Sequence, residues 1–203
     1  MIPDPRIRID VFDNVYDPSD DTYLLLESIE IGNHRKSLDM GCGTGIIAIH
    51  LAKQGLEVTA VDIDERAISN TIHNAKKNGV SIKVVRSDLF ERIKDRYDII
   101  AFNPPYLPSK GENVSWDGGE GGVEVIDRFL REAFNHLSPF GDIYMVVSSF
   151  TDMKTMIERY GSIYSFEIIK KRHIFFEDII SYRIRPRIRA PSCRPGGGTR
   201  YNP

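Results

Sequence analysis

The residues best suited to chemistry begin with a glycine-rich turn, LDMGCGTG, in which Gly41, Gly43 and Gly45 separate one apolar run from the next. Glycine allows a backbone to adopt positive φ and to approach a ligand closely, and the N-terminus of a following helix presents free N–H groups. Asp62 ends the next apolar run, where a carboxylate can accept hydrogen bonds from both hydroxyls of a ribose. This spacing predicts a site for a nucleoside.

Two further features indicate which nucleoside cofactor the site would bind. Nicotinamide enzymes use G-x-G-x-x-G, whereas the third glycine here comes one residue early. The carboxylate of Asp39, before the glycines, would repel a pyrophosphate but attract an amino group and a sulfonium. After a third apolar run, Asp88 could accept from the amine of adenine and Leu89 could cover a ring face. The set favours S-adenosyl-L-methionine over NAD; a structural turn for the glycines and a helix cap for Asp88 are the alternatives.

A second motif, Asn103-Pro104-Pro105-Tyr106, directly follows the apolar run YDIIAF. The two prolines have fixed φ and no N–H, so this backbone presents carbonyls rather than donors. The side-chain oxygen of Asn103 and the carbonyl of Pro104 could accept both hydrogens of a planar NH2 group, and Tyr106 could cover its plane. These four residues are the predicted catalytic set for methyl transfer to an amide or aromatic amine. A proline-rich turn without chemistry is the alternative.

Alternating strands and helices must position these residues. Apolar runs typical of buried strands lie at 37–40, 57–61, 82–85, 97–102 and 143–147, and helical patterns separate most of them. The last core segments, 163–169 and 174–184, are typical of two adjacent strands, with the basic run Lys170–Arg172 between them. We expect a three-layer, Rossmann-like α/β fold with a mostly parallel seven-stranded sheet and an antiparallel C-terminal strand.

The composition is that of one globular domain: 203 residues, 41% hydrophobic and 28% charged. We expect this domain over residues 1–184 and a disordered tail rich in arginine, proline and glycine over 185–203. The net charge of −2 disfavours bulk binding of nucleic acid. Cys42 and Cys193 lack the spacing of a metal site, and no apolar leader or membrane-length run is present, which favours a reducing, cytoplasmic setting.

The order of the motifs resembles the class I methyltransferases of the HemK type, the release-factor glutamine N5-methyltransferases, in particular their archaeal and eukaryotic branch. The resemblance covers most of residues 15–184 and is carried by VYDPSDDTYLLLESIE, DMGCGTG, the acid at Asp62, SDLF, FNPPY and WDGGEGGVEVIDRF. It implies the class I methyltransferase fold and S-adenosyl-L-methionine as cofactor. The residues that it implies as cofactor contacts are Thr22, Asp39, Gly41, Asp62, Asp88, Leu89 and Asn103.

The resemblance also implies a substrate and a partner. The acceptor would be the glutamine of the Gly-Gly-Gln loop of a class I peptide chain release factor, with Asn103 orienting its amide. A small zinc-binding activator subunit would pair with the chain, and the exposed edge of the third strand, Ile82–Val85, is where we expect it to add. Enzymes that methylate adenine N6 or guanine N2 in DNA or RNA use similar pockets. That activity, and a cofactor-binding scaffold without catalysis, are the alternatives.

Overall fold

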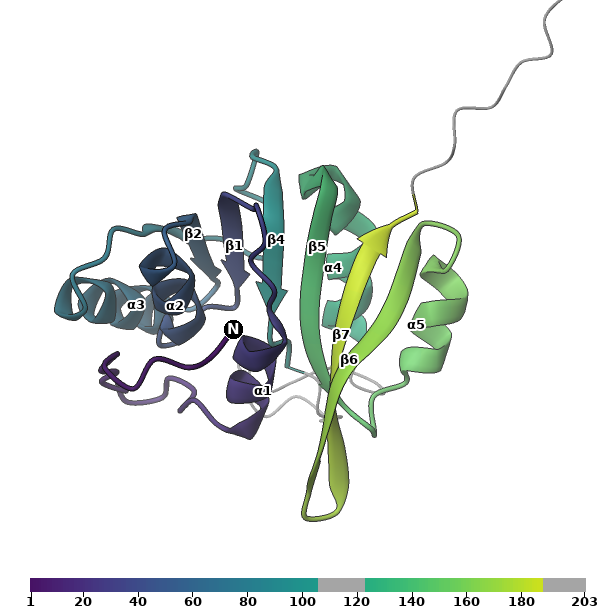
Figure 1. Cartoon of the computed structure of the whole chain (residues 1–203), viewed down its shortest axis with the longest axis horizontal. Coiled ribbons are helices and arrows are strands. Elements are labelled where there is room, and N and C mark those ends of the chain that lie inside the picture. The colour runs from purple at the N-terminus through teal and green to yellow at the C-terminus, as the bar shows by residue number, and fades with distance from the viewer. Residues whose placement is uncertain (106–122, 188–203) are drawn as a thin grey trace, which may run out of the picture.

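The computed structural model describes residues 1–105 and 123–187, and its centre is one seven-stranded sheet in the order β3-β2-β1-β4-β5-β7-β6 (Figure 1). The strands are β1 (Lys36–Met40), β2 (Glu57–Asp62), β3 (Lys83–Arg86), β4 (Tyr97–Phe102), β5 (Leu137–Ser148), β6 (Tyr164–Ile174) and β7 (Glu177–Pro186). The helices are α1 (Asp20–Ser28), α2 (Ile46–Lys53), α3 (Glu65–Lys77), α4 (Glu124–Ala133) and α5 (Met153–Tyr160). Strands β1 to β5 are parallel, and β7 runs antiparallel between β5 and β6. The expected fold is therefore confirmed.

Side chains alternate between the two faces of the sheet, and each face has its own apolar core. In β4, Ile99 and Ala101 pack with α1 and α2, whereas Ile100 and Phe102 pack with α4 and α5. All four are almost completely buried, as expected for a parallel strand covered on both sides. Helices cover both faces of the sheet, so its polar side chains are open to a ligand at the ends of the strands. In sheets of this kind, ligands bind at the carboxyl ends of the parallel strands.

The C-terminal hairpin differs from the sequence-based expectation in the place of its turn. The basic run Lys170–Arg172 lies within β6, and the turn falls at Phe175 and Phe176. Strand β6 is at the edge of the sheet, where charged side chains are tolerated. Both ends of the run pair with Glu27 of α1, so these charges hold the hairpin against the helix.

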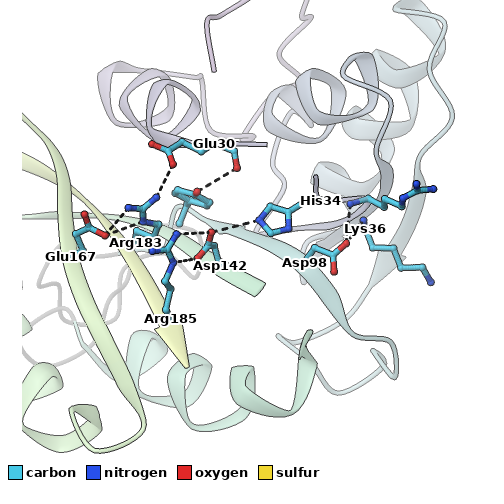
Figure 2. Close-up of polar contacts among 10 residues, drawn as sticks. Glu30, His34, Lys36, Asp98, Asp142, Glu167, Arg183 and Arg185 are labelled. Carbon is cyan, nitrogen blue, oxygen red and sulfur yellow. Dashed lines mark hydrogen bonds and ion pairs between the residues drawn. The ribbon is translucent and has the colours of Figure 1, made fainter. Parts of the chain in front are cut away.

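A network of polar contacts joins β7 to the rest of the domain (Figure 2). Arg183 pairs with Glu30 at 2.7 Å, and Arg185 pairs with the buried Asp142 of β5. Strand β7 continues to Pro186, two residues past the expected domain boundary at residue 184, because these arginines have partners inside the domain. The remainder of the predicted tail, 188–203, lies outside the described residues.

The N-terminal arm, residues 4–12, runs along α3 and is held there by asparagine side chains. Asn70, Asn74 and Asn78 lie four residues apart and so share one face of the helix. Their side-chain oxygens accept the backbone N–H groups of Phe12, Asp10 and Arg8 in that order, at 2.9, 2.9 and 3.0 Å. Their nitrogens donate back to carbonyls of the arm at 2.8 Å. The arm is therefore bound through its backbone, much as a strand would be.

Candidate functional site

The glycine turn connects β1 to α2, and its three glycines have φ of +66° at Gly41, +52° at Gly43 and +79° at Gly45. A Cβ on Gly45 would lie 2.9 Å from the side chain of Thr71 on α3, so this glycine allows α2 and α3 to pack closely. A Cβ on Gly43 would meet no atom of the described residues within 4 Å. The backbone at Gly43 is therefore open to the approach of a ligand.

Asp39 is buried beneath this turn, with 1% of its surface exposed. Its Oδ2 accepts the N–H of Ala48, in the first turn of α2, at 3.0 Å, but its Oδ1 has no hydrogen-bond partner among the described residues. Burial raises the pKa of Asp39 to about 7, the hydrogen bond from Ala48 opposes this, and the charge of Asp62 adds to it. An ammonium group beside Oδ1 would satisfy the acceptor and favour the ionised carboxylate.

Asp62, at the end of β2, lies against the same turn. Its two carboxylate oxygens accept the N–H groups of Gly43 and Asp64, each at 3.0 Å. These bonds fix the plane of the carboxylate, and each oxygen retains a lone pair for a hydroxyl group. Burial raises the pKa of the neighbouring Cys42 thiol, and the charges of Asp62 and Asp39 raise it further, so Cys42 is a packing residue rather than a nucleophile.

Asp88 and Leu89 follow β3 and have neighbours that the sequence did not indicate. Asp88 forms an ion pair of 2.8 Å with Arg128 of α4, and a third of its side chain is exposed. Leu89 has φ of +46° and packs with Phe90 in the core beneath α4. A turn, not a helix, follows Asp88, which excludes a role as a helix cap. The ion pair fixes the position of the Asp88 carboxylate beside the strand ends.

Asn103 directly follows β4, the neighbour of β1 in the sheet. A Cβ on Gly41 would lie 3.9 Å from the backbone oxygen of Asn103, so the two predicted motifs meet where these strands end. The Nδ2 of Asn103 donates to Asp21 at 3.1 Å, whereas its Oδ1 is buried without a partner among the described residues. Of the other motif residues, Pro104 is buried, Pro105 is half-buried and Tyr106 lies outside the described residues.

The start of α1 contributes a carboxylate, Asp21, which belongs to the motif VYDPSDDTYLLLESIE but whose contact with Asn103 the sequence did not indicate. Asp21 is 5% exposed, and both of its oxygens accept from the hydroxyl of Tyr16, at 2.9 Å. Thr22, an expected cofactor contact, is buried beside it, and its hydroxyl oxygen lies 3.5 Å from the Nδ2 of Asn103. In the sequence, this acid is typical of the first turn of any helix, so only its contact with Asn103 reveals it.

The expected residues thus converge on the carboxyl ends of β1, β2 and β4. Two buried acceptors there, the Oδ1 atoms of Asp39 and Asn103, have no partner among the described residues. Buried polar atoms of native proteins are nearly always hydrogen-bonded, so both indicate a ligand with amino or amide hydrogens. No group of three possible metal ligands occurs in the described ranges. The fold defines a Rossmann-like α/β protein whose candidate site lies at the carboxyl ends of its parallel strands.

Comparison with known proteins agrees with this class. The model of the methyltransferase small domain family matches residues 16–175. A putative protein N5-glutamine methyltransferase of Methanocaldococcus jannaschii is 35% identical over 183 residues, which are 86% of this chain and 93% of that protein. The human methyltransferase HEMK2 is 34% identical over 155 residues, which are 66% of this chain and 72% of that protein.

A solved structure is also similar to this chain. The E. cuniculi Mtq2–Trm112 complex, described as responsible for methylation of the termination factor eRF1, contains a chain that matches with a TM-score of 0.70 and 28% identity. The match covers 85% of this chain and 99% of that one. The present chain is therefore a methyltransferase of the small domain family, and within it belongs to the HemK type.

Proposed function

We propose that this protein transfers a methyl group from S-adenosyl-L-methionine to the side-chain amide of a protein glutamine, in the Gly-Gly-Gln loop of a class I peptide chain release factor. The observation that carries the proposal is a pair of buried acceptors at the ends of β1 and β4, Asp39 Oδ1 and Asn103 Oδ1, which have no hydrogen-bond partner within residues 1–105 and 123–187. One suits the ammonium group of the cofactor and the other suits the NH2 group of the substrate. The names of the relatives support an amide acceptor.

The residues present fit the cofactor. Asp39 would hold its ammonium group, Asp62 its ribose hydroxyls, and the backbone at Gly43 would allow close approach of the methionine part. Asp88 and Leu89 would contact the adenine from the neighbouring strand end. When bound, this cofactor supplies a methyl group on a positively charged sulfur, which is displaced in line as the new N–CH3 bond forms.

The contribution of the chain to the reaction is positioning and electrostatics. An amide nitrogen is a poor nucleophile because its lone pair is delocalised into the carbonyl. Asn103 Oδ1 and the Pro104 carbonyl would accept its two hydrogens, orient the nitrogen and favour the positive charge that develops on NH2 as it reacts. The excess proton then leaves to solvent. No covalent intermediate with the enzyme is needed, in agreement with the packing role of Cys42.

A small partner subunit, as in the Mtq2–Trm112 complex, fits one edge of the sheet. Strand β3 is an edge strand, as the sequence predicted, and its Val84 and Val85 are only half-buried. An added strand would complete its backbone hydrogen bonds and cover these side chains. Zinc binding by that partner is part of the same proposal, and it involves only residues of the partner.

We place this activity in the cytoplasm. Within residues 1–105 and 123–187 no helix is long and apolar enough to cross a membrane. The free thiol of Cys42, buried in the glycine turn, agrees with a reducing setting.

The decisive experiment measures transfer of labelled methyl groups from S-adenosyl-L-methionine to a class I release factor, with and without a Trm112-type subunit. A release factor in which the Gly-Gly-Gln glutamine is replaced is the substrate control, and DNA and RNA oligonucleotides are tested in parallel. We expect label on the intact release factor alone. Label on an oligonucleotide instead would establish the alternative amine, adenine N6 or guanine N2, as the acceptor.

A substitution connects the activity to the predicted pocket. Asn103→Ala should reduce kcat by about 100- to 1000-fold, as for loss of one preorganised hydrogen-bonding group. Asn135→Ala, which removes an exposed asparagine, is the matched control and should retain full activity. Normal turnover by Asn103→Ala would show that the amine is bound elsewhere.

A further inference from the structure

The two ends of the Asn103 side chain have opposite chemistry, and only one of them suits the proposed reaction. The Oδ1 atom accepts hydrogen bonds, whereas Nδ2 donates them, and a half-turn of the terminal amide exchanges their places. An NH2 substrate needs the oxygen, because a donor facing it would leave its hydrogens without a partner. In the described part of the chain, Oδ1 is the end without a hydrogen-bond partner, and Nδ2 lies 3.1 Å from an oxygen of Asp21.

Asp21 imposes this orientation through its own chemistry. A carboxylate can only accept, so the end of the Asn103 amide that faces it must be the nitrogen. The reversed amide would place two acceptors 3.1 Å apart inside the protein, which loses a charge-assisted hydrogen bond and adds repulsion. The assignment of nitrogen and oxygen therefore follows from the identity of residue 21.

Tyr16 in turn keeps Asp21 in place as an acceptor. Its hydroxyl donates to both carboxylate oxygens at 2.9 Å, and the backbone N–H of Thr22 donates to one of them at 2.5 Å. Burial raises the pKa of Tyr16, and the negative charge of Asp21 raises it further, so the hydroxyl stays protonated and remains a donor. The chain of contacts runs from Tyr16 through Asp21 to Asn103, the residue that we place against the substrate.

We propose that Asp21 is a positioning residue for methyl transfer: it anchors the Nδ2 of Asn103 so that Oδ1 is presented as the acceptor for the NH2 group of the substrate. The proposal rests on the proposed function in requiring an NH2 acceptor, but the anchoring contact itself does not depend on it. In this role Asp21 acts through Asn103.

A set of nearly isosteric variants of the full chain tests this role: Asp21→Asn, Asn103→Asp and the double variant Asp21→Asn/Asn103→Asp. Asp21→Asn lets the Asn103 amide adopt either orientation. Asn103→Asp places two carboxylates in contact. The double variant exchanges the partners, so an amide nitrogen at residue 21 can again donate to residue 103 while the second oxygen of residue 103 remains an acceptor. Asp20→Asn, which removes an exposed charge from the same helical turn, is the control.

We expect Asp21→Asn to lower kcat by about 10- to 100-fold, as for a misplaced catalytic group, with an unchanged KM for S-adenosyl-L-methionine. Asn103→Asp should lose at least as much, and the double variant should recover at least about tenfold over Asn103→Asp, because neighbouring residues in one network are not additive. Asp20→Asn should stay within about twofold of wild type. Turnover of Asp21→Asn near that of wild type, or a double variant no better than Asn103→Asp, would overturn the proposal.

A second measurement does not require turnover. The side-chain NH2 resonances of Asn103, assigned by their loss in Asn103→Asp, should shift and exchange faster with solvent in Asp21→Asn but not in Asp20→Asn. Unchanged resonances in Asp21→Asn would refute the anchoring contact. If wild type transfers no methyl group to the release factor while these resonances respond as expected, the anchoring stands and the substrate assignment fails.

Discussion

Asp39 should make the protein less stable as pH rises, in contrast to most carboxylates, and replacing it should reverse that loss. Burial raises its pKa from 3.8 to about 7. Between these values the folded protein keeps a proton that the unfolded chain has released. The folded state binds more protons, so stability falls as pH rises through this window and is constant above about 7.

The size of the effect follows from the part of the window that is tested. Between about pH 5 and pH 8 the folded state retains the extra proton over about two pH units, at about 1.4 kcal/mol per unit, which gives about 3 kcal/mol. Asp39→Asn cannot titrate, and its side-chain oxygen can still accept the N–H of Ala48. Relative to wild type, the variant should therefore gain about 3 kcal/mol on going from pH 5 to pH 8, which is about 6–12 °C in Tm for a chain of this size.

The assay is thermal or urea unfolding of both proteins at the two pH values, without cofactor, together with the affinity for S-adenosyl-L-methionine. Asp98→Asn is the control: burial raises the pKa of Asp98, but hydrogen bonds from the N–H groups of Lys36 and Arg35 outweigh it, and its pKa is lowered. Because this pKa lies below 3.8, Asp98 is ionised in both the folded and the unfolded state from pH 5 to pH 8, so the difference in stability between Asp98→Asn and wild type should be the same at both pH values. Asp39→Asn should bind the cofactor at least about 30-fold more weakly, as when one partner of a buried charge pair is removed. A pH-independent difference between Asp39→Asn and wild type would refute the reasoning.

Two further predictions concern how the domain is held together. Asn74→Ala leaves the N–H of Asp10 and the carbonyl of Thr44 without their partner and removes one of the two donors to the carbonyl of Asp10, so it should cost about 3 kcal/mol in unfolding experiments. The half-buried Asn78→Ala should cost about 1 kcal/mol, and equal losses would contradict the role assigned to burial. Truncation after Ile184 removes Arg185, the partner of the buried Asp142, and should lower the free energy of unfolding by about 3 kcal/mol. Truncation after Arg187 should leave the Tm unchanged. A large decrease in Tm from this second truncation would place part of the domain beyond residue 187.

The sequence predicted the sheet and the meeting of the two motifs because both follow from local patterns. Seven apolar segments have the composition of buried strands, and those at 82–85 and 97–102 are also too short for a helix. Parallel strands bring their carboxyl ends to one side. Asp39, Asp62 and Asn103 each end such a run or follow it closely, so their proximity could be inferred without coordinates. The turn at Phe175 and Phe176 could not, because a run of three cations is typical of a loop unless acids on α1 and β7 pair with it.

Contacts between distant segments were the second class of missed features. The ion pair of Asp88 with Arg128 joins residues forty positions apart, and no sequence pattern at either residue indicates the pairing. The asparagines of α3 are a different case, because their spacing of four residues on one helical face was visible in the sequence. A row of amides on one face of a helix can bind a backbone that lies along it, so this spacing could have located the N-terminal arm.

The carboxyl and amide groups at the two ends of the sheet differ in their partners among the described residues, although the hydroxyl of Ser37, near the amino end of β1, is also buried without a partner there. At the amino end of β4, Asp98 accepts two backbone N–H groups, and in the neighbouring strand Asp142 pairs with Arg185. At the carboxyl ends, Asp39 and Asn103 each have a buried oxygen that no other described residue satisfies. A fold selected only for stability would have filled both positions with partners or apolar groups. In the proposed function, bound amino and amide groups would satisfy both oxygens, so ligand binding should stabilise the folded protein.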